Sequence, residues 1–140
     1  MESTVDASQR RRIHPLHAIL LAGTIPLFLA AMVSDIAYTS SFQVQWSNFA
    51  SWLIAGGLVF GGLALVWAIV DLFRQWRGRP LLYALLLLVL WIVGFVNALI
   101  HAKDAWAAMP TGLILSVILV ALACGATWVG FSSLFAGGER

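Results

Sequence analysis

The chain has 140 residues, of which 61% are hydrophobic and only 10% are charged, and its mean hydropathy is +0.93. This composition excludes an ordinary soluble domain, because too few charged residues are present to cover a water-exposed surface. The net charge of +2 does not indicate nucleic-acid binding either, since the basic residues stand at the ends of apolar segments and not along one face. We therefore expect an integral membrane protein.

The first apolar segment, residues 14–35, follows three consecutive arginines and ends at an aspartate. The seventeen residues between His17 and Asp35 carry no formal charge, and at ~1.5 Å rise per residue they span roughly 27 Å, close to the thickness of a bilayer's hydrocarbon core. Alternating steps of three and four place seven side chains on one helical face, which should turn toward other helices. These seven are His14, His17, Leu21, Thr24, Phe28, Ala31 and Asp35.

The second apolar segment, residues 49–73, should follow a loop of about a dozen residues that carries interfacial aromatic rings. Its smallest residues form a stripe against which another helix can pack, and Gly57 and Gly61 make a GxxxG pair within it. The stripe consists of Ala50, Gly57, Gly61, Ala64 and Ala68, with Asp71 at its end.

The third and fourth apolar segments, residues 81–102 and 111–135, are separated from the second by Gly78 and Pro80 and from each other by a short link that ends at Pro110. The polar residues of the third segment collect at its end. Its periodic face consists of Tyr83, Leu87, Leu90, Gly94, Asn97, His101 and Asp104. The small residues of the fourth segment are Gly112, Ser116, Ala123, Thr127 and Gly130.

Four such segments predict an all-α, integral membrane four-helix bundle over residues 13–136, with short polar tails at residues 1–12 and 137–140. Seven of the eight basic residues then lie on one side of the membrane and only Lys103 lies on the other. Because basic loops stay in the cytoplasm, we expect both termini to be cytoplasmic.

This topology sorts the ionisable residues into two clusters, and the cytoplasmic one consists of His14, His17, Asp71 and Tyr83. Two imidazoles three residues apart, with a carboxylate from an adjacent helix, could hold a transition metal. The alternative is structural: His14 caps or anchors the helix at the headgroups, His17 bonds to a backbone carbonyl, and Asp71 pairs with Arg74 or Arg12. We favour the structural interpretation, because charges near the membrane surface are cheaper than charges at its centre.

The second cluster, Asp35, Asn97, His101 and Asp104, should lie near the periplasmic face. These side chains could exchange a proton or bind a cation, with Asp35 and His101 as partners. Here too a structural salt bridge or hydrogen bond is favoured, and Asp104 could simply be solvated.

The sequence gives little support for a bound cofactor or for a catalytic site. A six-coordinate haem needs two axial ligands from different helices at one depth, whereas His14 and His17 share a helix and His101 should lie a membrane thickness away. A haem would need a non-histidine ligand or a second subunit. The single cysteine, Cys124, excludes a disulfide framework. No catalytic or phosphate-binding motif is present, so an enzyme is unsupported.

The chain resembles a family of small bacterial inner-membrane proteins of unknown function. The resemblance rests on IHPLHAILLAGTIPL with Asp35 at the close of that helix, on AIVDLF, and on NALIHAKDAWAAMPTGLILS. It implies four spans and a location in the bacterial inner membrane, and no established activity. Members of that family commonly have a histidine where this chain has Tyr83, and often a more basic tail.

Three functions are compatible with these patterns. The favoured hypothesis is a non-enzymatic accessory or assembly subunit of a larger membrane complex, in contact with the bilayer and with membrane-protein partners or further copies of itself. The second is a protein that binds a metal or redox cofactor and is linked to electron transfer. The third is a small transporter or proton-handling protein that uses Asp35, Asn97 and His101.

Overall fold

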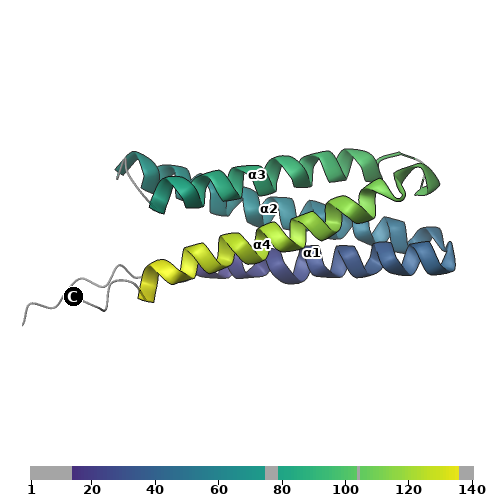
Figure 1. The fold of residues 1–140 in the computed structure, drawn as a ribbon, viewed down its shortest axis with the longest axis horizontal. Helices are drawn as coiled ribbons and strands as arrows, with labels where there is room; N and C mark the ends of the chain where they lie inside the picture. The colour runs from purple at the N-terminus through teal and green to yellow at the C-terminus, as the bar shows by residue number, and fades with distance from the viewer. Residues whose placement is uncertain (1–13, 75–78, 104, 136–140) are drawn as a thin grey trace, which may run out of the picture.

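The computed structural model describes residues 14–74, 79–103 and 105–135, which form four long helices and one short 3-10 helix. These are α1 (Pro15–Ser41), α2 (Val44–Arg74), α3 (Arg79–His101), η1 (Ala105–Ala108) and α4 (Thr111–Phe135). All four α-helices are long and apolar enough to cross a membrane. They lie side by side, with α1 against α2 and α4, and α3 against α2 and α4 (Figure 1). The predicted all-α four-helix bundle is confirmed.

The expected loop between the first two helices is wrong, because α1 continues to Ser41 and α2 begins at Val44. The hydroxyl groups at the end of α1 are accommodated within the helix. Thr39 Oγ1 donates to the carbonyl of Ile36 at 2.8 Å, and Ser41 Oγ donates to the carbonyl of Ala37 at 2.6 Å. These bonds satisfy the hydroxyl groups within the helix, so a sequence rich in Ser and Thr does not require a loop here.

The predicted inward face of α1 is buried along its length. His17, Leu21, Thr24, Phe28, Ala31 and Asp35 are all buried, and only His14, at the start, is exposed. The small-residue stripe of α2 is buried likewise, from Ala50 to Ala68, whereas Asp71 is exposed.

Glycines of α2 allow this helix to contact α1 and α3 closely. A Cβ on Gly57 would lie 2.5 Å from the ring of Phe28, and one on Gly61 would lie 3.2 Å from Leu90. Because these positions lack side chains, α2 approaches its neighbours closely enough for van der Waals packing to hold the helices together.

Two apolar clusters fill the middle of the bundle. One contains Leu21, Ala64 and Leu87, and the other contains Phe28, Leu90 and Leu119. They separate a polar group around His17 at one end from a polar group around Asp35 at the other. We call these the His17 end and the Asp35 end.

Candidate functional site

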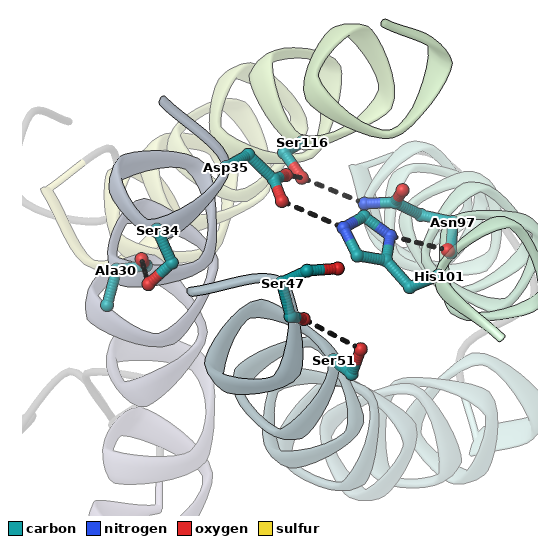
Figure 2. Close-up of polar contacts among 8 residues, drawn as sticks. All are labelled: Ala30, Ser34, Asp35, Ser47, Ser51, Asn97, His101 and Ser116. Atoms are coloured by element: carbon teal, nitrogen blue, oxygen red, sulfur yellow. Dashed lines mark hydrogen bonds and ion pairs between the residues drawn. The ribbon is translucent and has the colours of Figure 1, made fainter. Parts of the chain in front are cut away.

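A carboxyl group and an imidazole meet inside the bundle at the Asp35 end. His101 Nε2 lies 2.8 Å from Asp35 Oδ1, and both side chains are 0% exposed. Asp35 comes from α1, while His101 is the last residue of α3. The sequence predicted this partnership, and the structure brings the two residues together (Figure 2).

Two further side chains close a ring of hydrogen bonds around this pair. Ser116 Oγ, on α4, donates to Asp35 Oδ2 at 2.6 Å and accepts from Asn97 Nδ2 at 2.9 Å. The backbone carbonyl of Asn97 lies 3.0 Å from His101 Nδ1. The ring therefore runs through three helices and returns to its start, with Asn97 bonded to both halves (Figure 2).

The ring also determines how many protons the pair holds. A backbone carbonyl only accepts, so His101 Nδ1 carries a proton. Asp35 Oδ2 already accepts from Ser116. The remaining bond, between His101 Nε2 and Asp35 Oδ1, then contains one proton, held by either the nitrogen or the oxygen. In both arrangements the pair as a whole is neutral, which lowers the cost of burying it.

The start of α4 positions the imidazole. A Cβ on Gly112 would lie 2.7 Å from His101 Cε1 and 3.3 Å from Nε2. The backbone of α4 thus packs directly against the ring, which leaves His101 little freedom to turn away from Asp35.

Sequence reasoning assigned no chemical role to Ser116 or Ser47. Ser116, 1% exposed, was predicted only as a small packing residue, although a hydroxyl at this end of α4 is a signal that could have revealed it. Ser47 of α2 is buried beside the pair, and its own carbonyl accepts from Ser51 (Figure 2). Asp104, the fourth predicted member of the cluster, lies outside the described residues.

One acceptor of the network stays open. Within the part of the chain that the structure describes, Asn97 Oδ1 is buried and bonds to no protein group. It is the point at which a water molecule or another donor can join the ring.

The His17 end holds a smaller polar group. His17 Nε2 and the Tyr83 hydroxyl lie 2.8 Å apart, and the rings of His14 and His17 lie 5.1 Å and 5.6 Å from that of Trp67. His14 is exposed and caps α1, since its Nδ1 accepts from the backbone N–H of Leu16 at 3.3 Å. The predicted hydrogen bond from His17 to a backbone carbonyl is not seen. Nε2 pairs with Tyr83, and Nδ1 is buried without a partner among the described residues.

The predicted metal site gains no support from this geometry. Across the described ranges, no group of three or more His, Cys, Asp or Glu side chains is arranged to hold a metal ion. Asp71 is exposed. His17 and Asp35 are eighteen residues apart on α1, so His17 and His101 are separated by roughly 27 Å, too far to bind one haem from both sides.

The chain matches no curated protein and no solved structure. A family model described as a predicted membrane protein, DUF2231, matches residues 13–138. That match covers nearly the whole chain and agrees with four apolar helices of membrane-spanning length. The chain therefore belongs to the DUF2231 family of membrane proteins.

Proposed function

We propose that this protein is a proton-handling membrane protein that binds and releases a proton at the Asp35–His101 pair. The observation that carries the proposal is a fully buried carboxyl–imidazole contact of 2.8 Å between two membrane-spanning helices. Ionisable groups inside a membrane are expensive and commonly serve in proton relays or ion pathways. Here the two groups share a single proton, so gaining or losing one changes the charge of the site.

Few other ionisable groups surround the pair. The polar side chains drawn beside it are those of Ser47 in α2, Asn97 in α3 and Ser116 in α4, none of which titrates in the ordinary range (Figure 2). Lys103, two residues beyond His101, is exposed. Tyr38 follows one helical turn later on the same face of α1. The proton chemistry of this end thus belongs mainly to Asp35 and His101.

The apolar core restricts where the proton can go. Phe28, Leu90 and Leu119 are each 0% exposed and fill the bundle next to the site. This packing favours exchange with the aqueous phase at the Asp35 end over conduction through the bundle. The change in charge would then drive a conformational change or alter the binding of a partner protein.

The side of the membrane follows from the distribution of basic residues. Among the described residues, Lys103 stands at the Asp35 end, whereas Arg74 and Arg79 stand at the opposite end. A four-span topology assigns the remaining five arginines of the sequence to the same side as Arg74. We infer from this asymmetry that the Asp35 end faces the periplasm of a bacterial inner membrane and that both termini are cytoplasmic.

Proton binding is tested by titrating purified protein in nanodiscs while recording infrared difference spectra of the carboxyl groups. The wild-type protein should show a carboxyl signal, together with uptake or release of a proton, that is missing from Asp35→Asn. The Asp71→Asn variant is the matched control, because Asp71 is exposed at the other end of the bundle. Equal proton uptake by the wild-type protein and Asp35→Asn would contradict the proposal.

An accessory or assembly role is the second candidate. The observation that favours it is the shortness of the connection between α1 and α2, which consists only of residues 42–43 and leaves little extramembrane surface for ligand recognition there. Partners would then bind through the helix faces. Purification in a mild detergent tests this, since a chain that is always recovered alone would argue against an accessory role.

A further inference from the structure

Two hydrogen bonds join α1 to α3 across the diagonal of the bundle. These helices stand at opposite corners, since each of them packs against α2 and α4 (Figure 1). Asp35 of α1 nevertheless bonds to His101 of α3 at one end, and His17 of α1 bonds to Tyr83 of α3 at the other, both at 2.8 Å. His17 and Asp35 are eighteen residues apart, as are Tyr83 and His101. Since eighteen residues make about five helical turns, each helix uses one face for both bonds.

A proline divides α1 midway between these two bonds. Pro26 lies nine residues from His17 and nine from Asp35, inside a helix that continues through it. Because proline has no backbone N–H, the carbonyl of Ala22 receives no helical hydrogen bond from it, and helices bend at such positions. The two halves of α1, before and after Pro26, can therefore tilt relative to each other.

The middle of α1 is held against α2 on both sides of this proline. A Cβ on Gly23 would lie 2.5 Å from the ring of Phe60, and one on Gly57 would lie 2.5 Å from the ring of Phe28. In each contact, an aromatic ring of one helix occupies the space that a glycine leaves on the other. Such close packing resists sliding, so it gives the tilt a fixed pivot.

Beyond the pivot, one side chain provides the hydrogen bonds from α1 to the other long helices. Asp35 bonds to His101 of α3 and to Ser116 of α4. The other hydroxyl groups of this half all donate to carbonyls of α1 itself, and they belong to Ser34, Thr39, Ser40 and Ser41. Among the described residues, the polar attachment of this half to α3 thus depends on Asp35.

The bond from Asp35 to His101 requires the proton that the two groups share. The carbonyl of Asn97 and the backbone at Gly112 hold the imidazole in place, with its other proton on Nδ1. When the shared proton leaves, the lone pair of Nε2 faces a carboxylate oxygen and no bond remains. A buried carboxylate without this partner costs several kcal/mol, so the separation of α1 from α3 becomes favourable because it admits water.

We propose that residues 27–41 form an arm that swings away from α3 about Pro26 when the Asp35–His101 pair loses its shared proton. This inference rests on the proposed proton-handling function and names the movement that follows from it. The His17–Tyr83 bond keeps the first half of α1 attached to α3. Because only residues 42–43 join α1 to α2, the arm tilts slightly and takes the start of α2 with it.

The arm is tested by double electron–electron resonance, which measures the distance between two spin labels, on the full chain with Cys124→Ala in nanodiscs. Labels on Ser40→Cys and Leu99→Cys report on the separation of α1 and α3 at the Asp35 end. Labels on Leu16→Cys and Leu82→Cys report on their separation at the His17 end. All four labelled positions are exposed.

Raising the pH through the carboxyl transition seen by infrared spectroscopy should lengthen the Ser40–Leu99 distance by about 3–4 Å. This is the displacement that a tilt of about 10° produces fourteen residues beyond Pro26. The distance at the His17 end should not change. Asp35→Asn should keep the short distance as the pH rises, because its amide donates to the neutral imidazole and has no proton to lose.

Two controls exclude other ionisable groups. Around the pair, Ser47 of α2 and Ser116 of α4 do not titrate in the ordinary range, whereas Tyr38 of α1 is buried one turn further along and Lys103 is exposed beyond α3. Tyr38→Phe and Lys103→Gln should therefore retain the change in distance.

Pro26→Ala tests the pivot separately from the proton chemistry. It restores the N–H group and stiffens α1, so it should reduce the change in the Ser40–Leu99 distance by about half or more while the carboxyl transition persists. Leu29→Ala is the matched control, because Leu29 is exposed on the same half of α1 and its replacement alters no backbone bond.

Three results overturn the arm. They are a constant Ser40–Leu99 distance across the carboxyl transition, an equal lengthening at the His17 end, and an undiminished change in Pro26→Ala. Failure of the proton-handling function is seen separately, as the absence of the infrared transition. In that case His101→Ala, which removes the bond at every pH, still tests the arm, and a Ser40–Leu99 distance as short as in the parent protein overturns it.

Discussion

At the scale of single residues, the carboxyl group of Asp35 is the most demanding feature of the chain. Burying an ionised carboxylate costs several kcal/mol unless its oxygens find partners. Both oxygens of Asp35 are bonded, one to His101 and the other to Ser116. Because both carboxyl oxygens have partners, a substitution that keeps the shape of Asp35 can test its charge separately from its packing.

We predict that Asp35→Asn folds normally whereas Asp35→Ala does not. An asparagine can donate from Nδ2 to a neutral His101 Nε2 and accept from Ser116 through Oδ1, so all bonds of the ring survive. An alanine leaves both neighbours without their partner and should lower the free energy of unfolding by about 3–5 kcal/mol. Denaturant or thermal unfolding in detergent measures the difference, and equal losses in the two variants would contradict the ring of bonds.

Gly112 provides a second prediction at this scale. A methyl group there would lie 2.7 Å from His101 Cε1, so Gly112→Ala must displace the ring or the start of α4. We expect a loss of about 1–3 kcal/mol in unfolding free energy. Gly125→Ala is the control, because no atom lies within 4 Å of the position that its methyl group would take; it should be neutral or stabilising by up to about 1 kcal/mol.

At the scale of elements, α1 and α2 pack by placing an aromatic ring of α1 against a glycine of α2. The ring of Phe28 is fully buried against Gly57. In lipid, such close contact takes over the role that the hydrophobic effect plays between soluble helices. The contact therefore depends on the absence of a side chain at one position of the helix.

Neighbouring glycines of α2 allow a matched test of this packing. Gly57→Ala should destabilise the bundle by about 1–3 kcal/mol, because its Cβ would lie 2.5 Å from Phe28. Gly56→Ala should change stability by less than about 1 kcal/mol, since its nearest neighbour, Leu27, is at an ordinary 3.7 Å. Thermal unfolding of both variants in the same detergent checks the prediction. Equal effects of the two substitutions would contradict the packing argument, because both gain the same helix propensity and differ only in their contacts.

At the scale of the whole molecule, the bundle keeps its polar groups at two ends and an apolar core between them. Among the described residues the ends also differ in charge, because Arg74 and Arg79 stand at the His17 end and Lys103 stands at the Asp35 end. This asymmetry sets the expected orientation in the membrane, and with it the side from which the Asp35–His101 pair exchanges protons.

The orientation is tested by labelling single cysteines in intact cells with a membrane-impermeant maleimide. Cys124 is first replaced by alanine. Lys103→Cys, exposed at the Asp35 end, should then react from outside the cell. Arg74→Cys, exposed at the other end of α2, should react only after the membrane is permeabilised. The reverse pattern would place the proton site on the cytoplasmic side.

The sequence by itself determined the four membrane helices and the inward faces of their side chains. Hydrophobic length and the three–four spacing are local properties, and both survive in the structure: the periodic residues of α1 from His17 to Asp35 are buried. The sequence also placed Asp35, Asn97 and His101 at one depth, because helical rise converts residue number into height. Local polarity misled it where α1 meets α2, because the hydroxyl groups at the end of α1 bond to the helix's own carbonyls and need no loop.

Only the tertiary structure decided which atoms meet at that depth. The sequence could not reveal that Ser116 joins Asp35 to Asn97, or that Phe42 packs on Trp106. Each of these contacts joins residues from different helices or from the links between them. Their distances depend on how the helices are rotated and how closely they approach, and packing across the whole bundle sets both quantities.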